Sequence, residues 1–199
     1  MSRLKPLPSS STPTLKSHFD FFLGTLGFTP NSVLTMQRKP KLVQAFAQLN
    51  AAVMDPAGDV ELGFRRLIGH VVSKVSGCLY CQAHTLLGAQ NFGVSEAKMT
   101  DIWTYATSPH YSERERLALD FALAAASQPN AVTDAQFAQL QQHWPEGEIV
   151  EILAVVAMFA FLNRWNDTMA TPLEAPAIAV AQKVVGGQGW QPGKHAATS

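Results

Sequence analysis

The sequence predicts an all-α fold that carries a CxxC motif at the N-terminus of a central helix. Apolar residues recur at helical spacing in successive segments, for example over 41–54 and 146–164. Ser112 and Thr133 each begin the Ser/Thr-x-x-Glu/Gln pattern that is typical of a helix capping box. No segment has the sustained alternation of apolar and polar residues that marks a half-buried strand. We therefore expect helices to form the whole scaffold.

Glycine, proline and polar turns separate the expected helices, because these residues stop one helix or start the next. In chain order, helices are expected over 18–23, 33–37, 41–54, 59–76, 78–92, 95–103, 117–126, 137–144, 146–164 and 173–185. Asp59 is placed to cap the N-terminus of the fourth. The ninth is the most hydrophobic, which indicates a central position or a subunit interface.

The length of 199 residues is enough for one domain with a sizeable core, and we expect that domain over 15–185. Residues 1–14 hold three prolines among serines and should form an extended or mobile arm. Residues 186–199 are rich in glycine and polar residues and should form a loosely held tail.

Composition excludes several classes of protein. Hydrophobic residues make up 47% of the chain and the formal net charge is zero, which fits a globular protein and argues against an electrostatic nucleic-acid binder. No apolar run approaches the roughly 18 residues of a membrane span, and the first residues lack the apolar region of a signal peptide. We expect a cytoplasmic protein with no nucleic-acid or membrane partner.

Both cysteines lie in the segment 77–85, which reads GCLYCQAHT. In a helix, residues three apart lie roughly 5–6 Å apart at Cβ, so Cys78, Cys81 and His84 would form one stripe. A disulfide needs Cβ atoms about 3.5–4.5 Å apart, which the cysteines can reach with little movement. A helix N-terminus favours the thiolate of Cys78 and the imidazole favours that of Cys81, so spacing alone does not identify the nucleophile.

Other uses of the motif can be compared with this dithiol. Attachment of c-type haem needs a histidine directly after the second cysteine, where Gln82 stands. A thioredoxin-like site needs a strand before the motif, and the preceding residues have a helical pattern. Structural zinc needs four ligands, so Cys78, Cys81 and His84 would need a fourth, such as His70. That metal-binding or interaction module, and two thiols that merely pack as small hydrophobes, remain alternatives.

Residues 64–99, with GCLYCQAHT at their centre, resemble the alkylhydroperoxidase AhpD-like group of the carboxymuconolactone decarboxylase superfamily. The segments 27–31, GFTPN, and 161–164, FLNR, resemble flanking motifs of its longer, peroxidase-related members. The likeness thus covers most of the chain. It implies an all-helical homo-oligomer, a dimer, trimer or hexamer, that reduces peroxides through the CxxC dithiol and binds no cofactor.

The same resemblance implies roles for three side chains. Cys81 would be the peroxidatic cysteine that passes through a sulfenic acid, Cys78 the resolving cysteine, and His84 part of the proton relay. The substrates would be peroxides, including organic hydroperoxides, and a dithiol or a protein reductant would restore the thiols. A non-redox lyase of the decarboxylase branch is the alternative enzyme, although the CxxC makes that interpretation unnecessary.

Two positions depart from the family pattern. The family commonly has a glutamate twelve residues before the first cysteine, where Arg66 stands, and often a histidine four residues after the second, whereas His84 is three after it. On the helix expected over 59–76, His70 and Ser73 share the face of Arg66. We hypothesise that His70 replaces the carboxylate as relay and that Arg66 favours the thiolate. The alternative is a packed, hydrogen-bonded core histidine.

Polar residues close the very apolar helix expected over 146–164 and continue to Asp167. They can serve to solvate the helix end, whose carbonyl groups need partners. Alternatively, Asn163 or Asp167 reaches the cysteine pocket.

Overall fold

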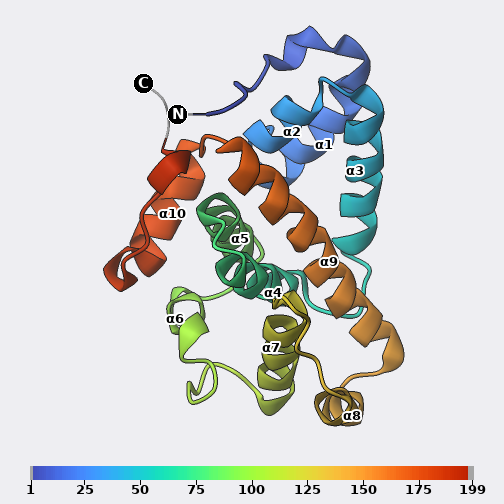
Figure 1. Ribbon diagram of the computed structural model, residues 1–199, viewed down its shortest axis with the longest axis vertical. Coiled ribbons are helices and arrows are strands. Elements are labelled where there is room, and N and C mark those ends of the chain that lie inside the picture. Colours follow the sequence, from blue (N-terminus) through green and yellow to red (C-terminus); the bar gives the residue numbers. More distant parts are fainter. Residues whose placement is uncertain (1, 197–199) are drawn as a thin grey trace.

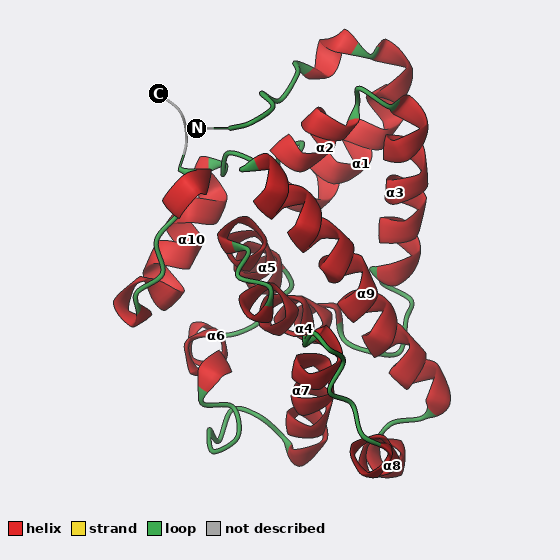
Figure 2. Ribbon diagram, viewed as in Figure 1, coloured by secondary structure: helices red, strands yellow, loops and turns green. Residues whose placement is uncertain are grey.

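The computed structural model describes residues 2–196, and these form helices joined by turns, with no strand among them (Figures 1 and 2). The α-helices are α1 (Lys16–Leu26), α2 (Asn31–Met36), α3 (Pro40–Val53), α4 (Leu62–Val75), α5 (Leu79–Asn91), α6 (Glu96–Thr100), α7 (Glu113–Ala126), α8 (Asp134–His143), α9 (Glu146–Met169) and α10 (Ala175–Val185). The predicted all-α fold is confirmed. Within the described part, no helix is both long and apolar enough to cross a bilayer.

The pair α4 and α5 forms the centre of the molecule (Figure 1). These two helices pack most extensively against each other; α9 and α10 pack against α5, and α7 and α9 pack against α4. Gly69 allows α9 to come close, because a Cβ at this position would lie 2.5 Å from Cε2 of Phe159. Phe159 is thereby held between α4 and the cavity described below.

Most helix starts differ from expectation by one to four residues, and those of α4 and α10 bear on the site. Asp59 is not the N-cap of α4, which begins at Leu62 after Glu61. The backbone N–H of Asp59 donates instead to Oε1 of Glu151, at 3.1 Å. The last α-helix begins two residues later than expected, and Glu174 occupies its N-cap position.

The segment 186–196 is packed rather than loose, which corrects the expectation for the tail; residues 197–199 lie outside the described residues. Trp190 and His195 are buried, with exposed fractions of 5% and 0%. The backbone carbonyl of His195 accepts a hydrogen bond from Leu173, at 2.8 Å. Burial of the two ring side chains and this bond hold the segment against α5 and α10.

The N-terminal arm runs beside α2 and the end of α9 (Figure 1). The backbone N–H of Arg3 donates to the carbonyl of Met169 at 3.0 Å, and that of Leu7 donates to Leu34 at 3.2 Å. The arm is hydrogen-bonded to the helical body at these residues and forms short 3-10 turns at Ser9–Ser11 and Pro13–Leu15.

Candidate active site

The two cysteines lie at the start of α5, directly after a turn that requires glycine. Gly77 has φ of +71°, a conformation that side chains disfavour, and it separates α4 from the motif. Cys78 is the N-cap residue, and its Sγ accepts a hydrogen bond from the backbone N–H of Cys81 at 3.4 Å. Both cysteines are free thiols, and both are buried. The predicted CxxC at the N-terminus of a central helix is confirmed.

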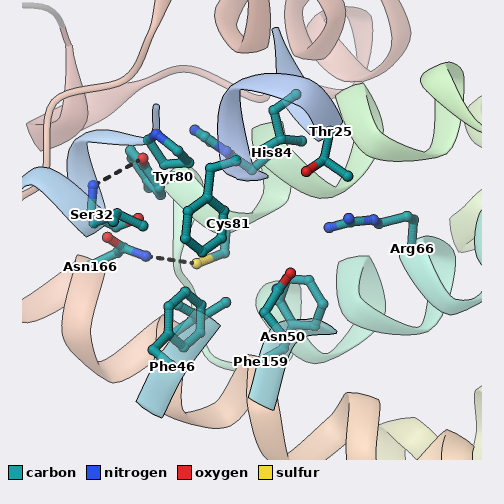
Figure 3. Close-up of a pocket in the computed structure, with 15 residues that line it drawn as sticks. Thr25, Ser32, Phe46, Asn50, Arg66, Tyr80, Cys81, His84, Phe159 and Asn166 are labelled. Carbon is teal, nitrogen blue, oxygen red and sulfur yellow. Dashed lines mark hydrogen bonds between the residues drawn. The ribbon is translucent and has the colours of Figure 1, made fainter. Parts of the chain in front are cut away.

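Cys81 faces a cavity of about 50 Å³ that is partly open to solvent (Figure 3). A single water needs roughly 10–15 Å³ on such a measure, so the space suits a small molecule or the reactive end of a larger one. Most of the wall is apolar and comes from α1, α2, α3 and α9: Phe22, Leu26, Val33, Phe46, Phe159 and Leu162. The polar part comprises Thr25, Ser32, Asn50, Arg66, Tyr80, His84 and Asn166.

The Cys81 thiol is neutral in the resting protein. Burial raises its pKa well above the ordinary value, and the hydrogen bond and charge of Cys78 act in the same direction. Asn166 opposes this shift, because its Nδ2 donates to Sγ of Cys81 at 3.4 Å and favours the thiolate. The sulfur therefore becomes nucleophilic only when its proton can leave.

His84 lines the same cavity and is held by a carboxylate from a distant part of the chain. Its Nε2 lies 2.6 Å from Oε2 of Glu174, and its ring stacks on Tyr80 at a centroid distance of 4.3 Å. The other oxygen, Oε1, accepts from the hydroxyl of Tyr80 at 3.0 Å and from the backbone N–H of Asn31 at 2.6 Å. These groups form a connected proton path beside Cys81.

The carboxylate of Glu174 stays ionised. Burial alone would raise its pKa, but the His84 charge and hydrogen bond, with the backbone N–H of Asn31, outweigh burial and lower the pKa. No spacing rule links Glu174 to His84 in the sequence, because 90 positions separate them. The only sequence signal is an acidic residue just before the Ala-Pro start of a helix.

Arg66 places a buried cation in the cavity, on the side of it away from Asn166 (Figure 3). Burial lowers its pKa to about 10, so the guanidinium remains charged at neutral pH. Its Nε has no hydrogen-bond partner among the described residues. Gly88 makes room for the side chain, since a Cβ there would lie 2.8 Å from Cδ of Arg66. This cation would attract an anionic or electron-rich group.

His70 lies outside the cavity and does not form part of its lining. Its Nδ1 lies 3.2 Å from the carbonyl oxygen of Gln82 and 3.1 Å from Oγ1 of Thr85. Burial lowers its pKa to about 4 against the opposing effect of the Gln82 bond, so the ring is neutral at pH 7. This geometry is that of the packed, hydrogen-bonded histidine of the alternative interpretation.

The expected stripe of Cys78, Cys81 and His84 is only partly formed. Cys81 and His84 share the cavity, whereas Cys78 lies near Asp167 on another side of the motif. Asn166, which sequence reasoning missed, reaches Cys81, while Asn163 donates to Ser76 at 3.3 Å. Among the described residues, the four ligands of the zinc alternative are not brought together, since His84 binds Glu174 and His70 lies outside the cavity.

Comparisons with known proteins agree with this architecture. The sequence profile of the carboxymuconolactone decarboxylase family matches residues 40–124. The chain is 27% identical over 110 residues to the uncharacterized protein YnjA of Escherichia coli K12, a match that spans 55% of this chain and 60% of that protein.

Solved structures resemble nearly the whole chain. A variant of the debrominase Bmp8, crystallised in complex with 2,3,4-tribromopyrrole, is 32% identical with a TM-score of 0.86 over 92% of this chain and 98% of that one. An uncharacterized peroxidase-related protein of Ralstonia eutropha JMP134, an alkylhydroperoxidase AhpD core, is 24% identical with a TM-score of 0.79 over 88% of this chain and 94% of that one.

Proposed function

Because the protein belongs to the carboxymuconolactone decarboxylase family and has the AhpD-like fold, we propose that it is a dithiol oxidoreductase that reduces peroxides. One observation carries the proposal: Sγ of Cys81 faces the cavity while Sγ of Cys78 contacts the Cys81 backbone from one turn away. This arrangement supplies a nucleophile with access to substrate and a second thiol in reach of it.

The first step oxidises Cys81 and reduces the peroxide. The Cys81 thiol loses its proton, and the thiolate attacks one peroxide oxygen and breaks the O–O bond. The sulfur keeps that oxygen as a sulfenic acid, and the other oxygen leaves as an alkoxide that takes up a proton to give the alcohol. Asn166 stabilises the thiolate by its hydrogen bond to Sγ.

The second step converts the sulfenic acid to a disulfide without further oxidant. The Cys78 thiolate attacks the sulfenic sulfur, the S–S bond forms, and hydroxide leaves with a proton as water. An external dithiol or a protein reductant then reduces the Cys78–Cys81 disulfide by thiol exchange. One turn of the cycle consumes one peroxide and one dithiol.

His84 is placed to supply the proton that the leaving alkoxide needs. It lines the cavity, and its Nε2 is joined to Glu174, which Tyr80 also contacts. Glu174 stabilises the protonated ring and fixes its orientation, so it acts as a positioning residue. Arg66 would stabilise negative charge on the departing oxygen.

The apolar wall favours organic hydroperoxides over hydrogen peroxide. Phe22, Phe46 and Phe159 can contact an apolar substituent, whereas hydrogen peroxide gains nothing from these rings. We therefore expect a lower KM for hydroperoxides with an aromatic substituent.

Reductive dehalogenation is a second candidate, favoured by the 32% identity to the debrominase Bmp8 and by the aromatic wall. A Cys81 thiolate would take the halogen from a halogenated aromatic ring, and the ring carbon would take a proton. Attack of Cys78 on the sulfur would release halide and leave the same disulfide. The dithiol chemistry is shared by both candidates, and only the electrophile differs.

A steady-state assay separates the substrates. Wild type, Cys78→Ser and Cys81→Ser are each supplied with dithiothreitol and with cumene hydroperoxide, hydrogen peroxide or a bromopyrrole, and alcohol, consumed peroxide or bromide is measured. We expect turnover of cumene hydroperoxide in wild type, and a loss of at least about 10²-fold in Cys81→Ser, since removing a nucleophile removes the covalent route.

Other outcomes of this assay point elsewhere. Release of bromide without turnover of peroxide would show that the protein is a dehalogenase rather than a peroxidase. Wild-type activity in both Cys78→Ser and Cys81→Ser would refute the dithiol mechanism for either substrate.

A further inference from the structure

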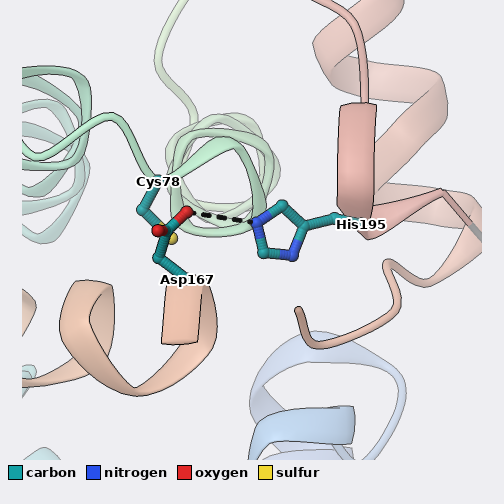
Figure 4. A group of neighbouring side chains, drawn as sticks. All are labelled: Cys78, Asp167 and His195. Atoms are coloured by element: carbon teal, nitrogen blue, oxygen red, sulfur yellow. Dashed lines mark ion pairs between the residues drawn. The ribbon is translucent and has the colours of Figure 1, made fainter. Parts of the chain in front are cut away.

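A second group of reactive side chains lies on the other side of the CxxC motif, outside the cavity of Cys81 (Figure 4). Cys78, Asp167 and His195 each direct one donor atom to a common point, and these atoms all lie within 4.8 Å of one another. Cys78 comes from the start of α5, Asp167 from α9, and His195 from the short helix η5 (Gly193–His195). The packed C-terminal segment thus carries a histidine to the first cysteine.

The hydrogen bonds of His195 fix its tautomer. Its Nδ1 lies 2.8 Å from the carbonyl oxygen of Thr171, which can only accept, so the ring proton is on Nδ1. Its Nε2 therefore carries the lone pair, and this atom is buried and has no hydrogen-bond partner among the described residues. The side chain is 0% exposed. A free basic nitrogen is held beside the Cys78 thiol.

Burial keeps the His195 ring neutral at neutral pH. Burial lowers its pKa below the ordinary 6.5, the Lys194 charge acts in the same direction, and the Thr171 bond and Asp167 oppose them. Oδ1 of Asp167 lies 3.6 Å from Nε2, while Oδ2 binds Nζ of Lys194 at 2.7 Å. Cys78 and Tyr80 are further titratable groups near His195, and the centroids of the Tyr80 and His195 rings lie 6.0 Å apart.

We propose that His195 is the general base that deprotonates Cys78 when the disulfide closes. The proposal rests on the dithiol cycle described above. Nε2 takes the Cys78 proton, and the Cys78 thiolate attacks the oxidised Cys81 sulfur. Hydroxide leaves on the cavity side, where it takes a proton from solvent and departs as water. The imidazolium keeps its proton until reduction of the disulfide, when it returns the proton to the Cys78 thiolate. Asp167, whose Oδ1 lies 3.6 Å from the same nitrogen, stabilises the imidazolium meanwhile by its negative charge.

Helix α9 supplies a different neighbouring residue to each of the two sulfurs. Two consecutive residues serve them, Asn166 at Cys81 and Asp167 at the Cys78 cluster. Cys81 has a hydrogen-bond donor that stabilises its thiolate, and Cys78 has a base. Substitutions at the Cys78 cluster can therefore change the rate of disulfide closure without changing the lining of the substrate cavity.

The same three donors are also those of an open zinc site, which uses three protein ligands and a water. The ammonium of Lys194 already neutralises the carboxylate of Asp167, however, and its positive charge disfavours a dication there. We therefore assign the cluster to proton transfer.

Single-turnover kinetics of the full chain test the proposal. Reduced wild type and His195→Gln are mixed with one equivalent of cumene hydroperoxide, and the Cys81 sulfenic acid is trapped with dimedone at successive times. We expect the sulfenic acid to form at an unchanged rate in His195→Gln and the disulfide to form about 10²-fold more slowly, the usual contribution of a general base.

The pH profile distinguishes a base from a structural histidine. In wild type the rate of disulfide closure should fall as pH falls through the His195 pKa, below 6.5, because the protonated ring accepts no proton. His195→Gln should lack this step. Added imidazole should restore disulfide closure in His195→Ala. The matched control is His110→Gln, at an exposed histidine, which should keep wild-type kinetics.

Diamide separates this inference from the proposed function. This oxidant forms an adduct with Cys81 that Cys78 resolves to the same disulfide, without any peroxide. A His195-dependent closure with diamide supports the inference even where peroxides do not react. Equal closure rates in wild type, His195→Gln and Asp167→Asn would overturn it, and so would stoichiometric zinc bound through Cys78 in the purified protein.

Discussion

The two sulfurs of the CxxC motif have different chemical surroundings. Asn166 donates to Cys81, and the cavity that Cys81 faces is largely apolar. His195 and Asp167 surround Cys78. These surroundings support the proposal that residues three apart in the sequence serve different steps, one the attack on the substrate and one the closure of the disulfide.

His70 makes stability depend on pH. Its pKa is about 4 in the folded protein and near 6.5 when unfolded, so between these values only the unfolded chain binds the proton. Stability should therefore fall as pH falls from 6.5 to 4, by about 3 kcal/mol from the difference in pKa. Urea unfolding of wild type and His70→Gln at neutral pH and near pH 4 measures this, and the variant should lose most of the slope.

His195, whose pKa is also lowered, contributes in the same direction, so some slope remains in the variant. The exposed His110→Gln is the control and should keep the wild-type slope. An unchanged slope in His70→Gln would show that the buried ring is protonated in the folded state.

At the scale of the elements, an ion pair joins the start of α4 to α9. Arg65 is 1% exposed, donates to the carbonyls of Val53 and Asp55, and contacts Oε2 of Glu151 at 2.8 Å. Glu151 also accepts the backbone N–H groups of Asp59 and Val60. This one carboxylate thus fixes the loop before α4 against α9. Helix α4 in turn carries Arg66, which lines the cavity.

Replacement of Glu151 should destabilise the fold. Glu151→Gln leaves the buried Arg65 guanidinium without its counter-charge, and we expect a loss of about 3 kcal/mol in the free energy of unfolding, as for other broken buried pairs. Urea unfolding measures it. Glu113→Gln, at an exposed glutamate of α7, should change stability by less than about 0.5 kcal/mol. Equal effects of the two variants would contradict a role for the pair.

Local sequence patterns predicted the helices because periodicity and capping act over a few residues. The capping box at Ser112 is present, with reciprocal bonds to Glu115, and Cys78 begins the cysteine helix. Patterns failed where a distant group intervenes: Glu151 binds the amide of Asp59, which was expected to be an N-cap. The tail was expected to be loose because its composition is polar, yet Trp190 is buried against the body.

The candidate site divides in the same way. Cys78, Cys81 and His84 could be predicted because one short helix carries them, and Asp167 because it follows a very apolar segment. Glu174 and His195 could not be predicted, since tertiary packing brings them to the motif from 90 or more positions away. The hypothesis of a His70 relay followed from the helix face that His70 shares with Arg66; Arg66 does line the cavity, but one turn further on His70 lies against Gln82 and Thr85 of α5 instead.

At the scale of the whole molecule, α9 presents an apolar stripe to solvent. Val150, Leu153 and Phe161 lie on one face of this helix and are 66%, 45% and 38% exposed. Leu49 of the neighbouring α3 is 46% exposed as well. We propose that a second copy of the chain covers this stripe, which agrees with the homo-oligomer that the family resemblance implies.

A charge on the stripe should disrupt self-association. Leu153→Glu places a carboxylate in the proposed interface, so light scattering after size-exclusion chromatography should show a wild-type oligomer and a smaller species for the variant. Lys41→Glu, at an exposed residue of α3, controls for the added charge. A monomeric wild type at micromolar concentration would contradict the proposal.

The central claim is that Cys81 takes the oxygen and Cys78 closes the disulfide. Mass spectrometry of reduced protein after one equivalent of cumene hydroperoxide tests it most directly. We predict a Cys78–Cys81 disulfide in wild type, one added oxygen on Cys81 in Cys78→Ser, and no oxygen on Cys78 in Cys81→Ser. Oxygen on Cys78 in Cys81→Ser, with Cys81 unmodified in Cys78→Ser, would reverse the two roles and contradict the account.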